Sequence, residues 1–208
     1  MSEESNLGFL HRFLPGAESR TLLLLHGTGG NEKDLLSLGR ALDPQAALLS
    51  PRGKVLENGM PRFFRRLAEG VFDEADLVRR THELADFIEA AAAHYDLDAK
   101  KITAIGYSNG ANIAGALLLL RANVLRGAAL LRPMVPLVPE TLPDLSGTPV
   151  LVAAGDHDPI VPPENARELA ALLRRAGADV TVTFENTGHN LTAATVENVR
   201  GWLTASAR

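Results

Sequence analysis

The stretch Gly106-Tyr107-Ser108-Asn109-Gly110 decides how this chain is interpreted. An apolar run, Ile102 to Tyr107, precedes it, and a run of small and apolar residues, Ala111 to Leu120, follows it. The sequence therefore predicts a strand that enters the serine and a helix that leaves it. A turn of this kind holds a serine hydroxyl clear of the edge of a sheet, where the hydroxyl can react. Gly106 and Gly110 fit such a turn, because a side chain at either position would crowd the helix against the strand.

Length and composition predict a single domain that spans residues 1–208. The 208 residues are 46% hydrophobic and 22% charged, with a formal net charge of -4, and one α/β domain normally contains about 100–250 residues. No block of Lys and Arg is present, so we expect a small-molecule substrate rather than nucleic acid or an anionic membrane surface. The absence of cysteine excludes disulfides, thiolate metal sites and a cysteine nucleophile.

The N-terminal residues predict a cytoplasmic protein without membrane insertion. Met1 to Ser5 are acidic and polar, whereas a secretory signal begins with basic residues and continues into an apolar stretch. The longest apolar runs, Leu22 to Leu25 and Ala114 to Leu120, are far shorter than the roughly 18 residues that span a bilayer.

Strand and helix signals alternate along the chain, which predicts an α/β fold with a mainly parallel central sheet and helices on both faces. Asn31 is expected to cap the first helix. Residues 51–66 and 132–149 are expected to be loops, and the second is too short to hold a cap domain. The predicted strands are 9–14, 21–26, 46–50, 102–107, 127–131, 150–154 and 180–184, and the predicted helices are 32–42, 73–95, 111–120, 163–176 and 192–205.

Polar residues follow four of the predicted strands, at the carboxyl edge where ligands bind in such sheets. One of these places is Ser108. The others are His26-Gly27-Thr28-Gly29-Gly30, Asp156-His157-Asp158 and Gly188-His189-Asn190. A serine, then an acid, then a histidine is the chain order of the catalytic triad in α/β-hydrolases.

Ser108, His189 and Asp158 are therefore the predicted catalytic residues. A serine hydroxyl is a poor nucleophile, so the neutral imidazole of His189 must take its proton during attack on a carbonyl. Asp158 would orient that ring through its other nitrogen. The backbone N–H groups of Thr28 and Asn109 are the expected oxyanion donors, and their side chains are expected to matter less.

On these residues the chain resembles the phospholipase/carboxylesterase family of α/β-hydrolases, which contains small bacterial carboxylesterases and acyl-protein thioesterases. The resemblance implies the α/β-hydrolase fold and cleavage of small carboxylic esters through an acyl-enzyme on Ser108. The stretch Phe63-Phe64-Arg65-Arg66, with Glu69-Gly70 and Phe72-Asp73, is further similar to the bacterial branch linked to catechol and hydroquinone resistance. The segments that carry the family resemblance are 25–30, 106–111, 155–162 and 188–189.

Several polar residues near these motifs have a structural interpretation instead. Asp156 competes with Asp158 for the role of the acid, but Asp158-Pro159 followed by Val161-Pro162 matches the acid loop of the family. His26 is interpreted as a packed histidine that orients the glycine-rich loop, and His157 as a solvated loop residue.

Neither a metal nor a cofactor is predicted. His82 and Glu83 are similar to the start of a zinc motif, but position 86 is Asp rather than the second His of H-E-x-x-H, so we expect a helix surface. The loop from Gly27 to Gly30 lacks the spacing of a phosphate-binding loop.

The candidate substrate-pocket residues are Phe63, Phe64 and Met134. Aromatic rings beside the cations of Arg62 to Arg66 would suit an aromatic or acidic ester, and the alternative is a solvated loop with one buried Phe. Met134, together with Leu137 and Val138, would form either an acyl-binding wall or a contact in a homodimer.

The same triad would also serve a thioesterase or a lysophospholipase. A binding module that keeps the fold without turnover is a further alternative, because a fold alone does not define a function. A peptidase is disfavoured in so short a chain without an added gating domain.

Overall fold

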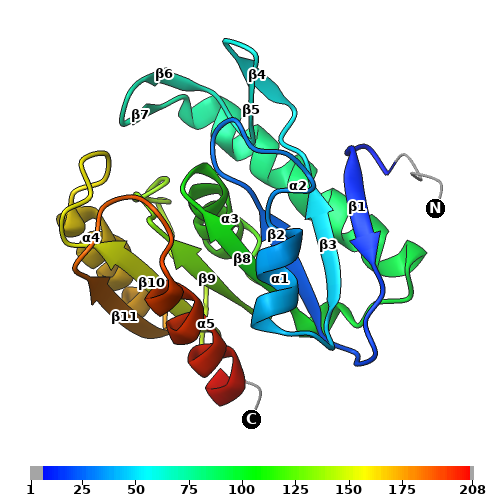
Figure 1. The fold of residues 1–208 in the computed structure, drawn as a ribbon. Helices are drawn as coiled ribbons and strands as arrows, with labels where there is room; N and C mark the ends of the chain where they lie inside the picture. Colours follow the sequence, from blue (N-terminus) through cyan, green and yellow to red (C-terminus); the bar gives the residue numbers. More distant parts are fainter. Residues whose placement is uncertain (1–6, 207–208) are drawn as a thin grey trace.

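The computed structural model describes residues 7–206, so the polar start from Met1 to Ser5 lies outside the described residues. Within this range, seven strands form the central sheet in the order β1-β3-β2-β8-β9-β10-β11 (Figure 1). β1 pairs antiparallel with β3, and all other neighbours pair parallel, which confirms the predicted mainly parallel sheet. The strands are β1 (His11–Leu14), β2 (Thr21–Leu25), β3 (Ala47–Pro51), β8 (Ile102–Tyr107), β9 (Gly127–Leu131), β10 (Pro149–Gly155) and β11 (Asp179–Glu185).

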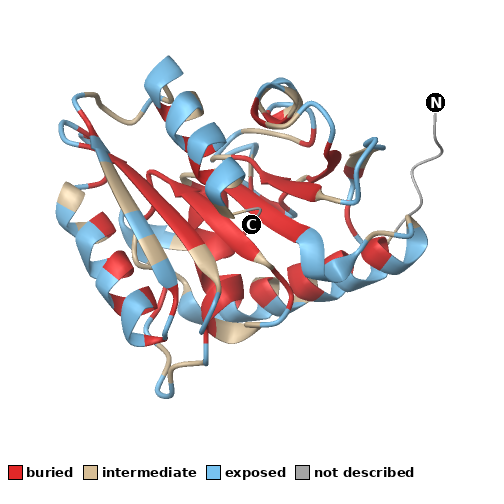
Figure 2. Ribbon diagram, turned by 90° about the horizontal axis from the view of Figure 1, so that it is seen from below, coloured by how far each residue is buried: buried red, intermediate tan, exposed pale blue. Residues whose placement is uncertain are grey.

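The central strands consist mainly of apolar residues, as expected where both faces of a sheet are covered. β2, β3 and β9 are buried at every position. β11, at the edge of the sheet, instead combines exposed and partly buried positions up to its last residue, as its mixed colouring in Figure 2 shows. The alternating character predicted for this strand is thus that of an edge strand.

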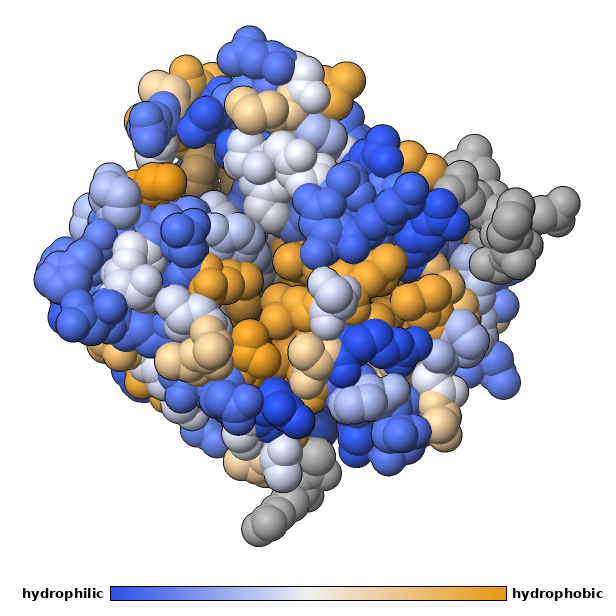
Figure 3. All heavy atoms as spheres, in the orientation of Figure 1, coloured by the Kyte–Doolittle hydropathy of each residue, from blue (hydrophilic) through white to orange (hydrophobic). Residues whose placement is uncertain are grey.

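Helices cover both faces of the sheet, as predicted. α2, α3 and α4 pack on one face in a large apolar cluster, and α1 and α5 pack on the other in a smaller one. Figure 3 shows the face that carries α1 and α5, where apolar residues gather in the middle between hydrophilic borders. The helices are α1 (Leu36–Leu42), α2 (Glu74–His94), α3 (Asn109–Leu120), α4 (Pro163–Arg175) and α5 (Ala193–Ser206), with a short 3-10 helix, η1, at Ala99–Lys101.

The first helix begins later than predicted, and Asn31 does not cap it. α1 starts at Leu36 rather than near residue 32. The Asn31 side chain accepts a hydrogen bond from the backbone N–H of Lys33 at 2.9 Å. This contact closes a local turn, which is a common alternative use of an asparagine side chain.

The prediction of an irregular loop at 51–66 is wrong, because two short hairpins are built from this region and the residues that follow it. β4 (Val55–Glu57) pairs with β5 (Met60–Arg62), and β6 (Arg66–Ala68) pairs with β7 (Val71–Phe72). Both hairpins stand at the top of Figure 1, above the central sheet. By contrast, residues 132–148 contain no helix or strand, as predicted.

Within residues 7–206, no helix combines the length and the apolar character needed to cross a membrane.

Candidate active site

Ser108 occupies a strained turn between β8 and α3. Its backbone angles are φ +52° and ψ -113°, a combination that costs a residue with a side chain of order 1–3 kcal/mol. The turn is tight on both sides. A Cβ on Gly106 would lie 2.5 Å from the carbonyl oxygen of Gly110, and a Cβ on Gly110 would lie 2.0 Å from that of Leu25 in β2. The two glycines are therefore required, for the reason that the sequence suggested.

The structure brings Ser108, His189 and Asp158 together from three different loops. His189 Nε2 lies 3.0 Å from Ser108 Oγ, and His189 Nδ1 lies 2.6 Å from Asp158 Oδ2. The carboxylate favours the ring tautomer with the proton on Nδ1, which leaves Nε2 free to accept the serine proton. Each residue directly follows a parallel strand or lies in the loop beyond it, so the topology of the sheet gathers all three at one edge.

Asp158, not Asp156, is the acid that contacts the histidine. The second oxygen of Asp158, Oδ1, accepts hydrogen bonds from the backbone N–H groups of Ile160 and Val161 at 2.8 and 3.0 Å. Both oxygens of this buried carboxylate are thus used, and its orientation is fixed. Asp156 is exposed, and its backbone N–H donates to the carbonyl oxygen of Glu185 at 2.8 Å.

His26 is buried and connects the glycine-rich loop after β2 to Gly53 through hydrogen bonds, as predicted for a packed histidine. His26 Nε2 accepts a hydrogen bond from the N–H of Gly53 at 3.0 Å, so Nδ1 carries the proton and donates to the carbonyl oxygen of Gly27 at 2.7 Å. Burial lowers the pKa of His26, although the Gly27 carbonyl and the Asp34 charge act in the opposite direction. The ring is therefore kept neutral.

The backbone N–H groups of Thr28 and Asn109 are available to a ligand. Neither donates a hydrogen bond to any residue in the part of the chain that the structure describes, and both residues line the cavity that contains Ser108. Their side chains make contacts that the sequence did not predict. Thr28 Oγ1 accepts from Arg62 Nη1 at 2.6 Å, and Asn109 Oδ1 accepts from the N–H of Phe63 at 2.8 Å.

The cavity beside Ser108 has a volume of 300 Å³ and lies between the serine and the hairpin residues. Met134 lines it, as predicted, but Phe63 and Phe64 do not. Both phenylalanines are buried in the hydrophobic core, where Phe64 packs against Phe72 with ring centroids 5.0 Å apart. The expectation that they line the pocket is therefore corrected. The two arginines that flank them, Arg62 and Arg66, line it instead.

The remaining candidate residues divide between core and surface. Leu137 is buried in the core, whereas Val138 is 65% exposed, so neither joins Met134 in a common acyl-binding wall. His82 and His157 are exposed, in agreement with the interpretation of both as solvated residues.

Two residues that the sequence analysis missed, Arg132 and Glu185, support the histidine loop. Arg132 is buried at the carboxyl end of β9 and pairs with Glu185 at the end of β11. Arg132 Nη2 also donates to the carbonyl oxygen of Asn190, the residue after His189, at 3.1 Å. The sequence signal for this role was the position of Arg132, a charged residue directly after the buried strand β9. Tyr107 Oη also contacts this loop, because it donates to the carbonyl oxygen of His189 at 3.2 Å.

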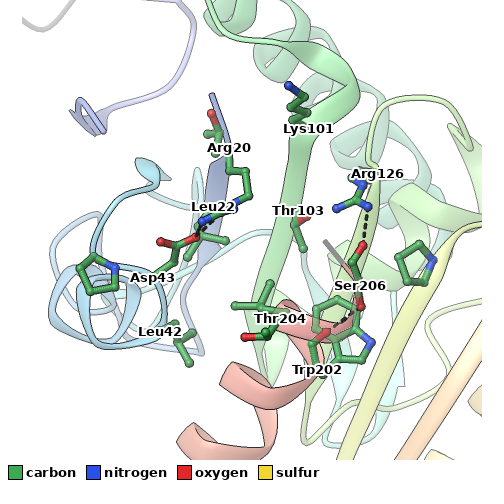
Figure 4. Close-up of a pocket in the computed structure, with 14 residues that line it drawn as sticks. Arg20, Leu22, Leu42, Asp43, Lys101, Thr103, Arg126, Trp202, Thr204 and Ser206 are labelled. Atoms are coloured by element: carbon green, nitrogen blue, oxygen red, sulfur yellow. Dashed lines mark hydrogen bonds and ion pairs between the residues drawn. The ribbon is translucent and has the colours of Figure 1, made fainter. Parts of the chain in front are cut away.

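A second cavity, of 230 Å³, lies at the amino-terminal ends of the sheet strands (Figure 4). It is lined by Thr21, Thr103 and Pro149, which lie at or near the amino ends of their strands. Ser108 lies beyond the carboxyl end of its strand, so this cavity is separate from the candidate active site.

The fold and the site together define an α/β-hydrolase: a mainly parallel sheet with a serine turn after β8, an acid after β10 and a histidine after β11. A model of the phospholipase/carboxylesterase family matches residues 15–207, and the chain belongs to that family.

Similar proteins agree with this assignment. The chain is 54% identical to the hydrolase MhqD of Bacillus subtilis (strain 168) over 192 residues. These aligned residues cover 92% of this chain and 96% of MhqD. The structure is similar to that of the Bacillus cereus carboxylesterase, with a TM-score of 0.95, 52% identity and coverage of 98% and 97% of the two chains. It is also similar to a carboxylesterase from Mesorhizobium loti, with a TM-score of 0.91, 34% identity and coverage of 96% of each chain. The protein is an esterase-type hydrolase.

Proposed function

We propose that the protein hydrolyses small carboxylic esters through an acyl-enzyme on Ser108, with His189 as the general base and Asp158 as the residue that orients it. The observation that carries this proposal is the continuous pair of hydrogen-bond contacts, 2.6 and 3.0 Å long, that links the three side chains. These distances lie within the range required for proton transfer between a nucleophile and its base.

In the first half of the reaction, Ser108 Oγ attacks the ester carbonyl carbon while His189 Nε2 takes the hydroxyl proton. The C–O bond to the alcohol then breaks, and the same proton passes from the imidazolium to the departing alkoxide. In the second half, His189 removes a proton from water, which attacks the acyl-enzyme, and the proton returns to Ser108 as the carboxylic acid leaves. The Asp158 carboxylate stabilises the imidazolium in both halves.

The negative charge that develops on the carbonyl oxygen needs fixed donors. The free backbone N–H groups of Thr28 and Asn109 fit this role, because both border the cavity beside Ser108. Loss of one such donor typically costs about 3 kcal/mol of transition-state stabilisation. The side-chain contacts of both residues to the hairpin region hold the two amides in place.

The size of the cavity favours a small ester. At 300 Å³ it lies at the lower end of the roughly 300–1,000 Å³ range of small-molecule sites. A long lysophospholipid chain would extend beyond it. A thioester would use the same serine, histidine and acid, so thioesterase activity is the second enzymatic candidate. We expect the protein to act in the cytoplasm as a single domain.

Steady-state hydrolysis of p-nitrophenyl acetate tests the proposal. Ser108→Ala should lower kcat by at least about a thousandfold, whereas Ser37→Ala, which changes an exposed serine on α1, should leave kcat unchanged. Full activity in Ser108→Ala would contradict the acyl-enzyme. Comparison of kcat/KM for phenyl acetate and phenyl thioacetate then decides between an esterase and a thioesterase. No turnover of either compound by folded wild-type protein would favour a binding module.

A further inference from the structure

One wall of the cavity beside Ser108 is cationic. Arg62, at the end of β5, and Arg66, at the start of β6, both line it. The side chain of Arg62 is only 4% exposed and that of Arg66 is 30% exposed. The lining also contains the apolar side chains of Met134 and of Phe72, which pairs with Arg66 in the β6–β7 hairpin. The cavity therefore presents both positive charge and apolar surface beside the serine.

Arg62 is buried with an unused donor. Its Nε donates to the carbonyl oxygen of Phe64 at 3.2 Å, and its Nη1 donates to Thr28 Oγ1 at 2.6 Å. Among residues 7–206, Arg62 Nη2 has no hydrogen-bond acceptor. It is also absent from the fully buried, unpaired polar atoms of these residues, so it is not completely enclosed by protein. Because Arg62 and Thr28 both line the cavity, this edge of the guanidinium is open to a ligand there.

The two arginines share a single carboxylate. Glu57 lies 3.4 Å from Arg62 Nε and 2.7 Å from Arg66 Nη2. Burial lowers the pKa of Arg62. The Glu57 charge raises this pKa, whereas the Arg66 charge lowers it further. Glu69 is the acidic residue of the lining; it is exposed and makes no ion pair within the described residues. Among the described residues, the two arginines therefore have one paired carboxylate between them, and Glu69 is a second, unpaired carboxylate in the lining.

We propose that this wall selects carboxylic esters that carry a second, ionised carboxylate. Such a group would accept hydrogen bonds from Arg62 Nη2 and from Arg66, while the uncharged part of the ester contacts Met134 and Phe72. Arginine suits this role because its planar donors match the two oxygens of a carboxylate. The inference rests on the proposed esterase function and adds the class of its substrate.

The test compares two aryl acetates, of which one is anionic and one is neutral: 4-acetoxybenzoate and 4-acetoxybenzamide. Their kcat/KM ratio, anionic over neutral, is measured for the wild type and for Arg66→Gln and Arg62→Gln. The intrinsic reactivity of each compound is the same in every variant, so it cancels when the ratios are compared. Arg65→Gln is the matched control, because Arg65 is in the same segment but is 63% exposed, pairs with Asp73 and does not line the cavity.

We expect Arg66→Gln and Arg62→Gln each to lower the ratio by about tenfold, and Arg65→Gln to leave it within about twofold. An unchanged ratio in Arg66→Gln would overturn the inference even if Arg62→Gln reduced all activity through its Thr28 contact. That result would leave the esterase function intact, since the neutral ester would still be hydrolysed. Loss of the proposed function would show separately, as absence of turnover of both compounds in the folded wild type.

Discussion

Arg132 and Glu185 form an ion pair in the interior, with Arg132 Nη2 3.1 Å from Glu185 Oε2 and side chains that are 0% and 8% exposed. The same guanidinium binds the carbonyl oxygen of Asn190, directly after His189. Burial alone raises the pKa of Glu185, but hydrogen bonds from two threonine hydroxyls and the Arg132 charge outweigh this effect and lower it. The loop that carries the histidine is therefore tied to a charged pair within the sheet.

Removal of one partner of this pair should damage both stability and turnover. A buried charge without its partner costs about 3–5 kcal/mol, so Arg132→Met should lower the free energy of unfolding by about that amount. It should lower kcat more than it raises KM, because the His189 loop loses an anchor. Urea unfolding and steady-state kinetics measure these effects. The double variant Arg132→Met/Glu185→Leu should recover much of the stability but not kcat.

The control for this pair is Arg121→Met, since Arg121 makes partly exposed ion pairs with Asp86 and Glu89. Pairs of that kind contribute at most about 1 kcal/mol. Equal losses of stability in Arg121→Met and Arg132→Met would contradict the account of the buried pair.

His26 should make stability depend on pH. Burial lowers its pKa below the ordinary value of 6.5, so the unfolded chain binds a proton at a higher pH than the folded protein does. The stabilisation is complete above about pH 6.5 and is lost as the pH falls from there toward the pKa of the folded state. Between about pH 7.5 and 5.5, the free energy of unfolding should fall more in the wild type than in His26→Asn. His157→Asn, which changes an exposed histidine, should behave like the wild type. Parallel pH curves for His26→Asn and the wild type would count against this prediction.

The strain at Ser108 can be measured as a difference between two inactive variants. Glycine adopts a positive φ readily, whereas alanine does not. Ser108→Gly should therefore be more stable than Ser108→Ala by about 1–3 kcal/mol, as measured by urea unfolding. Both variants lack the hydroxyl, so the comparison isolates the backbone. Equal stabilities would mean that the turn at φ +52° is not strained.

The two glycine positions Gly110 and Gly201 should respond in opposite ways to alanine. A Cβ on Gly110 would lie 2.0 Å from the carbonyl oxygen of Leu25, whereas a Cβ on Gly201, within α5, would meet nothing within 4 Å. We expect Gly110→Ala to prevent folding or to destabilise the protein by more than about 3 kcal/mol. Gly201→Ala should instead stabilise it by up to about 1 kcal/mol. Thermal unfolding of Gly110→Ala with an unchanged midpoint would refute the close packing of the turn.

The sheet and the four polar loops were predictable because their signals are local and strong. Buried parallel strands are short apolar runs, and the glycines around Ser108 are required by contacts within the turn itself. The contact of Asp158, rather than Asp156, with His189 agrees with the expectation from the sequence, although the N–H donors of Ile160 and Val161 that hold this carboxylate became visible only in the structure.

The hairpins and the pocket were harder to predict. Asn58-Gly59 is a strong signal for a two-residue hairpin turn, and both residues have a positive φ of +52° and +79°. The strands on either side have only three residues each and no clear apolar alternation, so the signal was missed. The burial of Phe63 and Phe64 depends on contacts with residues distant in the sequence, such as His26. The local sequence therefore does not show that Arg62 and Arg66, rather than the phenylalanine rings between them, line the cavity.

Intact-mass spectrometry after treatment with a fluorophosphonate probe tests the central claim most directly. An activated serine reacts covalently with such a probe, whereas an ordinary hydroxyl does not. We predict a single adduct on wild-type protein that maps to the peptide containing Ser108, and no adduct on Ser108→Ala. A folded wild-type protein that remains unmodified, or an adduct that persists in Ser108→Ala, would contradict the assignment of Ser108 as the nucleophile.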